Sequence, residues 1–224
     1  MKILIPINFF IVILISNISF AEEKHEEEQD LYQIKLIMIT HNISNYIEYD
    51  EKFIDDKYEE FKYIEILKNN CLIKSDNSCG KYDFDYKLDS FNNHKESLES
   101  DKEIKVVSHI EWVQKIDSEK FIKIKGGYDY SNEVLENSLD IKDIEILSSG
   151  RVTKYEGATL ITKEKFFKVN INLFEKMIMK PPSFFSTDIL TSKKYIISQN
   201  IMLNKTTYID RDNFGFIIKI NKIK

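Results

Sequence analysis

The sequence predicts an α+β fold: a single domain with a largely antiparallel β-sheet of about seven strands and two or more helices, after an N-terminal signal peptide. Two observations predict the sheet. Apolar and polar residues alternate along several runs, which is the period of half-buried strands, and most runs follow one another in sequence order. The helices are predicted from stretches where apolar residues recur every three positions and from a helix-start signal.

Composition sets the first limits on function. The chain has 224 residues, enough for one hydrophobic core or at most two small ones. Its hydrophobic share of 42% excludes wholesale disorder. The formal net charge is −5, and the charged clusters mix both signs, as solvated faces do. A chain of this kind, without a concentrated Lys/Arg stripe, is a poor nucleic-acid binder.

The N-terminus carries an export signal. Lys2 precedes the almost unbroken apolar run Ile3–Ile15, and small residues stand at the −3 and −1 positions of a cleavage site after Ala21. Residues 1–21 are therefore predicted to be a signal peptide, and residues 22–30 an acidic flexible linker. The alternative is an uncleaved anchor, because residues 3–20 nearly reach spanning length. With cleavage, no stable membrane span remains.

Export changes the interpretation of the two cysteines. Cys71 and Cys79 lie at the ends of a polar loop rich in Asn, Ser and Asp. Such a loop can bring its ends together, and an oxidising compartment keeps the thiols bonded. We therefore predict a disulfide. The competing interpretation, a metal site, lacks a His or a second Cys pair within ligand spacing.

The first half of the chain begins with a buried strand. Residues 31–40 are apolar on both faces, as in a central strand. Apolar residues three apart favour a helix over Lys57–Lys68. Ser90 is typical of a helix N-cap, and the following helix carries Phe91 and Leu98 on one side.

A second long strand is predicted over Ile104–Gln114. Strict alternation divides its side chains between two faces. One face holds Ile104, Val106, Ile110 and Trp112, and the other holds Lys105, His109 and Glu111.

The next segments favour a short strand, a helical turn and a hairpin. Residues 121–125 form a strand that Gly126-Gly127 ends, because glycine takes backbone angles closed to other residues. One or two helical turns are expected over Ser131–Asp140. Residues 155–162 and 165–174 then form a hairpin, whose second arm alternates cleanly.

The C-terminal part predicts two closing strands. After a loop opened by Pro181-Pro182, apolar residues alternate along Tyr195–Leu203 and again along Phe214–Ile220. A polar connection between these strands carries Tyr208 and Asp210. A chain that ends on a strand usually ties its terminus into a sheet, so this segment is expected to close the fold.

No recognised catalytic or cofactor motif is present. The sequence lacks a nucleophile elbow, an H-E-x-x-H pair, a phosphate-cradling Gly-rich loop and a C-x-x-C pair. We therefore expect no cofactor or metal site. As a lone histidine on a strand, His109 favours a hydrogen-bonded structural role. For Trp112, the only tryptophan, the favoured interpretation is packing in the core. The alternative is that its ring stacks on a sugar.

Four segments and one short link of this sequence match the motifs of one known protein family. Each matches a short family pattern, and together they follow the family's order. The segments are Leu31–His41; Lys105–Gln114 with Ser108-His109, Trp112 and Gln114; Tyr155–Leu173 with Gly157, Leu160, Phe166-Phe167 and Val169-Asn170; and Tyr208-Ile209-Asp210 with Phe214-Gly215. The link is Ile124-Lys125-Gly126-Gly127. On these residues the sequence resembles the CsiV family of periplasmic peptidoglycan-binding proteins.

The sequence also departs from the family pattern. Arg211-Asp212 stands where the family has His-Pro, and Thr207 stands where it has His. Asn200, Leu203 and Asn204 replace arginines of a basic run, and the cysteine-bearing insertion has no counterpart in the pattern. If that run helps hold the anionic wall polymer, binding here is weaker or uses another face.

The resemblance implies an exported, non-enzymatic protein. Residues 31–224 would form a CsiV-like α+β domain in the periplasm. It would bind peptidoglycan and support wall synthesis and cell shape through an LpoA-type outer-membrane lipoprotein activator and a class A penicillin-binding protein. The matching motifs indicate six ligand-binding residues: His109, Trp112, Gln114, Tyr208, Asp210 and Phe214.

Two other classes of function stay open. A secreted or membrane-anchored structural protein without wall-polymer binding could use Asn42 and Asn204, each in an N-x-S/T context, as glycan acceptors. A wall hydrolase would need paired carboxylates or an activated nucleophile in a cleft.

Overall fold

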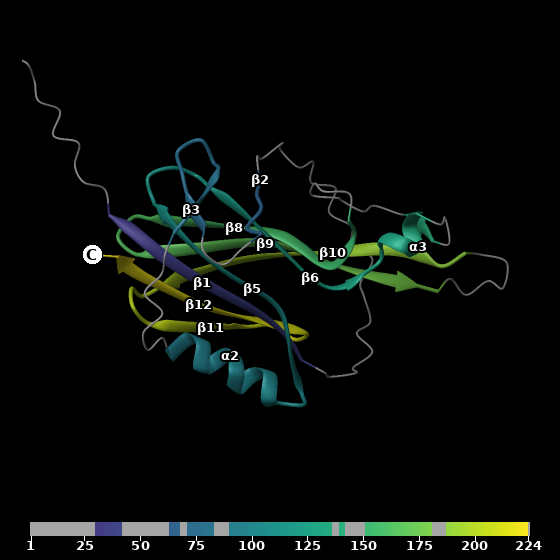
Figure 1. Ribbon diagram of the computed structural model, residues 1–224. Coiled ribbons are helices and arrows are strands. Elements are labelled where there is room, and N and C mark those ends of the chain that lie inside the picture. Colours follow the sequence, from purple (N-terminus) through teal and green to yellow (C-terminus); the bar gives the residue numbers. More distant parts are fainter. Residues whose placement is uncertain are drawn as a thin grey trace, which may run out of the picture.

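Two β-sheets form the body of the protein, pack against each other and share one hydrophobic core (Figure 1). The computed structural model describes residues 30–41, 63–67, 71–82, 90–135, 139–141, 151–180 and 187–223. Within these ranges it contains twelve strands and two helices. Most neighbouring strands pair antiparallel; β2 with β6, β3 with β5 and β7 with β10 pair parallel.

Each sheet contains six strands. The first sheet has the order β11 (Thr206–Asp210), β12 (Phe214–Ile223), β1 (Leu31–His41), β5 (Ile104–Lys115), β3 (Cys71–Ile73) and β4 (Cys79–Lys81). The second has the order β2 (Tyr63–Ile64), β6 (Phe121–Asp129), β8 (Thr153–Lys163), β9 (Phe167–Met179), β10 (Ile189–Ile201) and β7 (Asp140–Ile141). The helices are α2 (Ser90–Ser100) and α3 (Ser131–Leu135).

The predicted α+β class, with one sheet of about seven strands and two or more helices, is wrong. The described part of the chain is mainly β, and its only helix longer than five residues is α2. Several strands have only two to five residues, too few to show a readable period in the sequence. Residues 63–64 of the predicted helix Lys57–Lys68 are strand β2, while residues 57–62 and 68 lie outside the described ranges.

Strand β1 is the central strand of the first sheet, as its unbroken apolar sequence predicts. It pairs antiparallel with β12 on one side and with β5 on the other, along nearly its whole length. Ile34, Leu36 and Met38 point into the core that the two sheets share. Ile37 and Ile39 point to the opposite face.

Helix α2 covers part of that opposite, outer face of the first sheet (Figure 1). Its Phe91 is fully buried against Ile37, Ile39 and Ile217, with Leu98 at the margin of the same cluster. The sequence predicted this helix, and both residues expected on its apolar side make the contact.

A β-bulge changes which side chains of β5 face the core. The register between β1 and β5 shifts between Met38 and Ile39. Ile110 and Trp112 therefore lie in the shared core, while Ile104 and Val106 pack under α2. The prediction that all four share one face is wrong, because an extra residue in a strand reverses the alternation beyond it.

Strand β6 runs past the glycine pair that was expected to end it. It continues to Asp129, with an irregular register after Gly126. A Cβ on Gly126 would lie 2.4 Å from the carbonyl oxygen of Val107 on β5. Gly127 has a φ of 84°, a conformation that suits glycine. The pair lets β6 pass close to the first sheet without ending the strand.

The hairpin of β8 and β9 is confirmed. The two strands pair from Tyr155 with Glu175 to Lys163 with Phe167. At its centre, a Cβ on Gly157 would lie 2.1 Å from the backbone oxygen of Asn172, so only glycine fits there. The alternating residues Val169, Ile171 and Leu173 are buried in the shared core, as predicted.

The two closing strands belong to different sheets. Strand β10 pairs with β9 in the second sheet, and β12 pairs with β1 in the first. The polar connection predicted between them contains a further strand, β11, which pairs with β12. The C-terminal segment thus contributes strands to both sheets. The edge of the first sheet on this side is β11, not the last strand β12.

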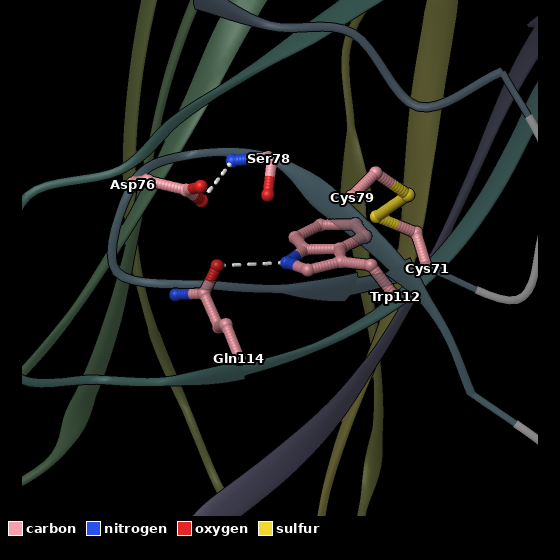
Figure 2. Close-up of a disulfide and its surroundings, with 6 residues drawn as sticks. All are labelled: Cys71, Asp76, Ser78, Cys79, Trp112 and Gln114. Atoms are coloured by element: carbon pink, nitrogen blue, oxygen red, sulfur yellow. Dashed lines mark hydrogen bonds between the residues drawn. A yellow bond between two sulfur atoms is a disulfide. The ribbon is translucent and has the colours of Figure 1, made fainter.

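The β3–β4 hairpin covers Trp112 and holds the predicted disulfide. Cys71 and Cys79 are bonded, with their Cα atoms 5.2 Å apart. Cys71 lies opposite Trp112 in the pairing of β3 with β5, and Figure 2 shows the indole beside the sulfur atoms. The indole N–H donates to Gln114 Oε1 at 2.8 Å, and both side chains are fully buried.

Several predictions fall outside the described residues. These are the signal peptide, nearly all of the acidic linker, Asn42 and the Pro181-Pro182 loop. Among the residues that the structure describes, no helix combines the length and apolarity that a membrane crossing requires.

Removing the disulfide should loosen the hairpin over Trp112. We expect the double substitution Cys71→Ser and Cys79→Ser to lower the free energy of unfolding by about 2–3 kcal/mol, as for a short closed loop. Because the only tryptophan lies beside the disulfide, its fluorescence should also rise when this quencher is lost. Urea unfolding followed by fluorescence checks both effects. An unchanged midpoint would contradict a stabilising role for the bond.

Candidate binding surface

An aromatic and charged cluster lies at one end of the first sheet, on its outer face. It contains Tyr208 and Asp210 of β11 and His41 at the end of β1, and we call it the Tyr208 cluster. The Tyr208 hydroxyl donates to Asp210 Oδ1 at 2.8 Å and lies 3.3 Å from His41 Nε2. His41 Nε2 in turn lies 3.4 Å from Asp210 Oδ1. The Tyr208 side chain is held, yet 49% of the residue's surface is exposed.

Gly215 provides the seat for this tyrosine. A Cβ on Gly215 would lie 2.7 Å from Cε2 and 2.8 Å from the hydroxyl oxygen of Tyr208. Residues Gly215 and Asp210 are partners in the pairing of β12 with β11. The ring therefore lies directly on the glycine backbone, and any larger residue would lift it away. This contact explains why Tyr208 and Gly215 occur together in the motif.

Hydrogen bonding and burial set the protonation states of the cluster. Partial burial and the hydrogen bond to Asp210 raise the pKa of Tyr208 to about 12. The hydrogen bond from Tyr208, with a smaller contribution from His41, holds the pKa of Asp210 below its ordinary value. Near neutral pH the cluster thus presents a neutral phenol and a carboxylate, a pair that can bind sugar hydroxyls or amide groups.

Phe214 precedes Gly215 on β12 and points to the opposite face of that strand, into the core that the two sheets share. Its ring centroid is 4.9 Å from that of Tyr195 and 5.9 Å from that of Tyr155, both in the second sheet. These tyrosine hydroxyls donate to the buried carboxylate of Glu175, at 3.0 and 3.1 Å. Phe214 therefore holds the two sheets together, and no part of it is exposed.

The other predicted ligand-binding residues lie elsewhere. Trp112 and Gln114 are fully buried under the β3–β4 hairpin. His109 lies partly buried under α2, with its ring centroid 6.2 Å from that of Phe91. Burial, aided by the nearby charges of Lys95 and Lys35, lowers the pKa of His109, which favours the neutral ring.

The structure therefore divides the six predicted residues into separate groups. Tyr208 and Asp210 meet at the surface. Trp112 and Gln114 bond to each other in the interior, and Phe214 and His109 each pack elsewhere. Sequence reasoning missed His41 as a member of the cluster. The feature that could have identified His41 is its position: it lies two residues after Ile39, so it points to the same face of the strand.

Buried ion pairs are also present away from the cluster. On the first sheet, Lys35 Nζ lies 3.3 Å from Glu111 Oε1. On the second, Glu156 bridges Lys123, at 3.2 Å, and Lys176. These side chains are almost fully buried, so they hold the sheets rather than offer a contact surface. In the described ranges, no group of three or more His, Cys, Asp or Glu residues could hold a metal ion.

The phenol of Tyr208 should titrate unusually late. Its raised pKa means that the tyrosine stabilises the folded state below about pH 10, and this contribution is lost as the pH rises toward 12. Asp210→Asn should lower the pKa of Tyr208, though not to the ordinary value, because burial remains. Ultraviolet absorbance titration of both proteins, with Tyr208→Phe to assign the signal, measures this. Equal titration of the Asn variant and the wild type would contradict the contact.

Comparison with known proteins identifies the family. A family model described as "Peptidoglycan-binding protein, CsiV" matches residues 8–223, nearly the whole chain. No curated protein and no solved structure gives a match. The match extends across both sheets and includes the strands that carry the Tyr208 cluster, in agreement with the motif resemblance. The chain therefore belongs to the CsiV family of peptidoglycan-binding proteins.

Proposed function

We propose that this protein is an exported, non-enzymatic adaptor that contacts peptidoglycan through the Tyr208 cluster. The observation that carries the proposal is the seating of Tyr208 on Gly215, beside His41 and Asp210. An aromatic ring held in one orientation loses little conformational freedom when a ligand packs on it. The adjacent carboxylate and imidazole supply polar groups for the hydroxyls and amides of the wall polymer.

The other motif residues support this choice by their positions. Trp112, Gln114 and Phe214 have no exposed surface, so a polymer could reach them only after the protein opened. We assign these three residues to the scaffold and assign the contact with the wall polymer to the exposed residues of the same motifs. Tyr128, another exposed aromatic residue, lies on β6 of the second sheet and provides a matched comparison.

Periplasmic location and partners are part of the proposal. The apolar N-terminal run supports export, and the family's description supports wall binding. The CsiV resemblance further suggests that the protein assists an LpoA-type lipoprotein activator and, through it, a class A penicillin-binding protein. A protein that holds the wall on one face and the activator on another would raise the local concentration of the synthase at its substrate. Wall synthesis and cell shape would then depend on it.

Substitution of Tyr208 should weaken wall binding. We expect Tyr208→Ala to bind purified sacculi about tenfold less tightly, because an aromatic contact contributes about 1–1.5 kcal/mol. Co-sedimentation of residues 22–224 with sacculi measures the affinity.

Tyr128→Ala is the control for this experiment. Tyr128 is 56% exposed, and its hydroxyl also donates to a carboxylate, that of Glu133. This variant should bind sacculi like the wild type. If the wild type stays in the supernatant, wall binding by this chain is wrong. If both variants bind fully, the Tyr208 cluster is not the contact. Soluble wall fragments released by the wild type would contradict a non-enzymatic role.

Recruitment of the activator should depend on the adaptor. A purified LpoA-type activator should co-sediment with sacculi more strongly when wild-type protein is added, and Tyr208→Ala should reduce this gain in step with its own loss of wall binding. The control is a direct binding measurement between activator and variant, which should match the wild type. An activator that gains nothing from the wild-type protein would contradict the adaptor role and leave wall binding intact.

A further inference from the structure

Among the described residues, part of one edge of the second sheet, at the end of β10, lacks the usual protection. Strand β10 pairs with β9 over all thirteen of its residues, but among the described residues β7 covers only Ile189 and Leu190 of its other side. In an antiparallel pair, half of the backbone N–H and C=O groups point away from the neighbouring strand. Residues 196–201 thus present backbone groups along an edge that no described strand occupies.

Natural proteins usually protect such an edge with charges, prolines, bulges or short strands. The segment Ile196–Ile201, of sequence IISQNI, contains no charge and no proline, and its pairing with β9 continues without a register shift. Ile196 is 67% exposed, and Ser198, Gln199 and Asn200 are exposed as well. An unprotected, regular edge of this kind is the structure to which an extended peptide adds as a further strand.

Charge indicates which kind of peptide would fit. The chain as a whole carries a formal charge of −5. Yet residues 189–209, which include all of β10 and most of β11, contain three lysines and no Asp or Glu. Lys168, paired with Asn200 on the adjacent strand, is exposed and adds another positive charge. The edge therefore favours an extended peptide that carries free carboxylates.

We propose that the Ile196–Ile201 edge binds the peptide stem of the wall polymer by strand addition; this rests on the proposed wall binding. The stem is a short peptide whose amides match the backbone groups of the edge and whose free carboxylates match the lysines beside it. About five extended residues reach at most about 17 Å, and six strand residues offer about 20 Å. The edge leads through residues 202–205 directly into β11, so the stem site and the Tyr208 cluster lie on consecutive strands.

Removal of the stems from the wall tests the proposal. Residues 22–224 are sedimented with intact sacculi and with glycan strands from which an amidase has cut the peptides. We expect binding to the stripped glycan to be at least tenfold weaker, and a soluble stem peptide to compete for intact sacculi. Equal binding to stripped and intact material would overturn the stem assignment and leave wall binding in place. No binding to intact sacculi would instead overturn the proposed function.

Charge substitutions at the edge provide a second readout. Ile196→Glu should weaken binding to intact sacculi about tenfold, whereas Ile196→Lys should bind at least as well as the wild type. Ile178→Glu, on an exposed isoleucine of β9 in the same sheet, is the matched control and should bind normally. Equal losses at positions 196 and 178 would overturn the proposal. So would a wild-type dimer in analytical ultracentrifugation that Ile196→Glu converts to monomer, because a second copy would then occupy the edge. If Ile196→Glu fails to fold, the proposal is tested by the binding of Ile196→Lys to intact sacculi and by the binding of the wild type to the stripped glycan.

Discussion

The pair Phe214-Gly215 at the start of β12 is the constraint on which both the fold and the proposed binding surface depend. Phe214 points inward and packs against Tyr195 and Tyr155, which belong to the opposite sheet. Gly215 points outward and leaves room for the Tyr208 ring. Because successive side chains of a strand point to opposite faces, two adjacent residues can serve both purposes. The orientation of the surface aromatic is thus coupled to the packing that joins the sheets.

A similar division explains most of the family motifs. Trp112 and Gln114 bond to each other under a disulfide-closed hairpin, and Gly126 and Gly157 allow backbone approaches that a Cβ would block. These residues define how the two sheets fit together; all are buried except Gly126, which is half-buried. Of the six predicted ligand-binding residues, only Tyr208 and Asp210 combine exposure with polar chemistry, and they lie beside the half-buried His41. Most of the named residues that match the family pattern therefore belong to the scaffold of this chain.

The sequence predicted those elements whose signal extends over many residues. Strand β1 and the β8–β9 hairpin each show a sustained apolar pattern. Ser90 predicted the start of helix α2, and the polar loop between Cys71 and Cys79 predicted the disulfide. It could not predict that the segments form two sheets, because periodicity identifies strands but not their partners. The bulge opposite Met38 leaves no mark in the residue pattern, yet it reverses the face of Ile104. Likewise, the cluster of His41 with Tyr208 forms only after strands distant in sequence pair with β12.

Strand β1 also sets a distance. The chain enters this strand at Leu31, beside Ile223 near the C-terminal end of β12, and leaves it at His41. Eleven residues of extended backbone separate these points by about 33 Å. If a surface held the chain ahead of Leu31, Tyr208 would therefore lie at the opposite end of a rigid strand, away from the point of attachment. The strand that organises the interior would at the same time determine how far from its tether the molecule can reach.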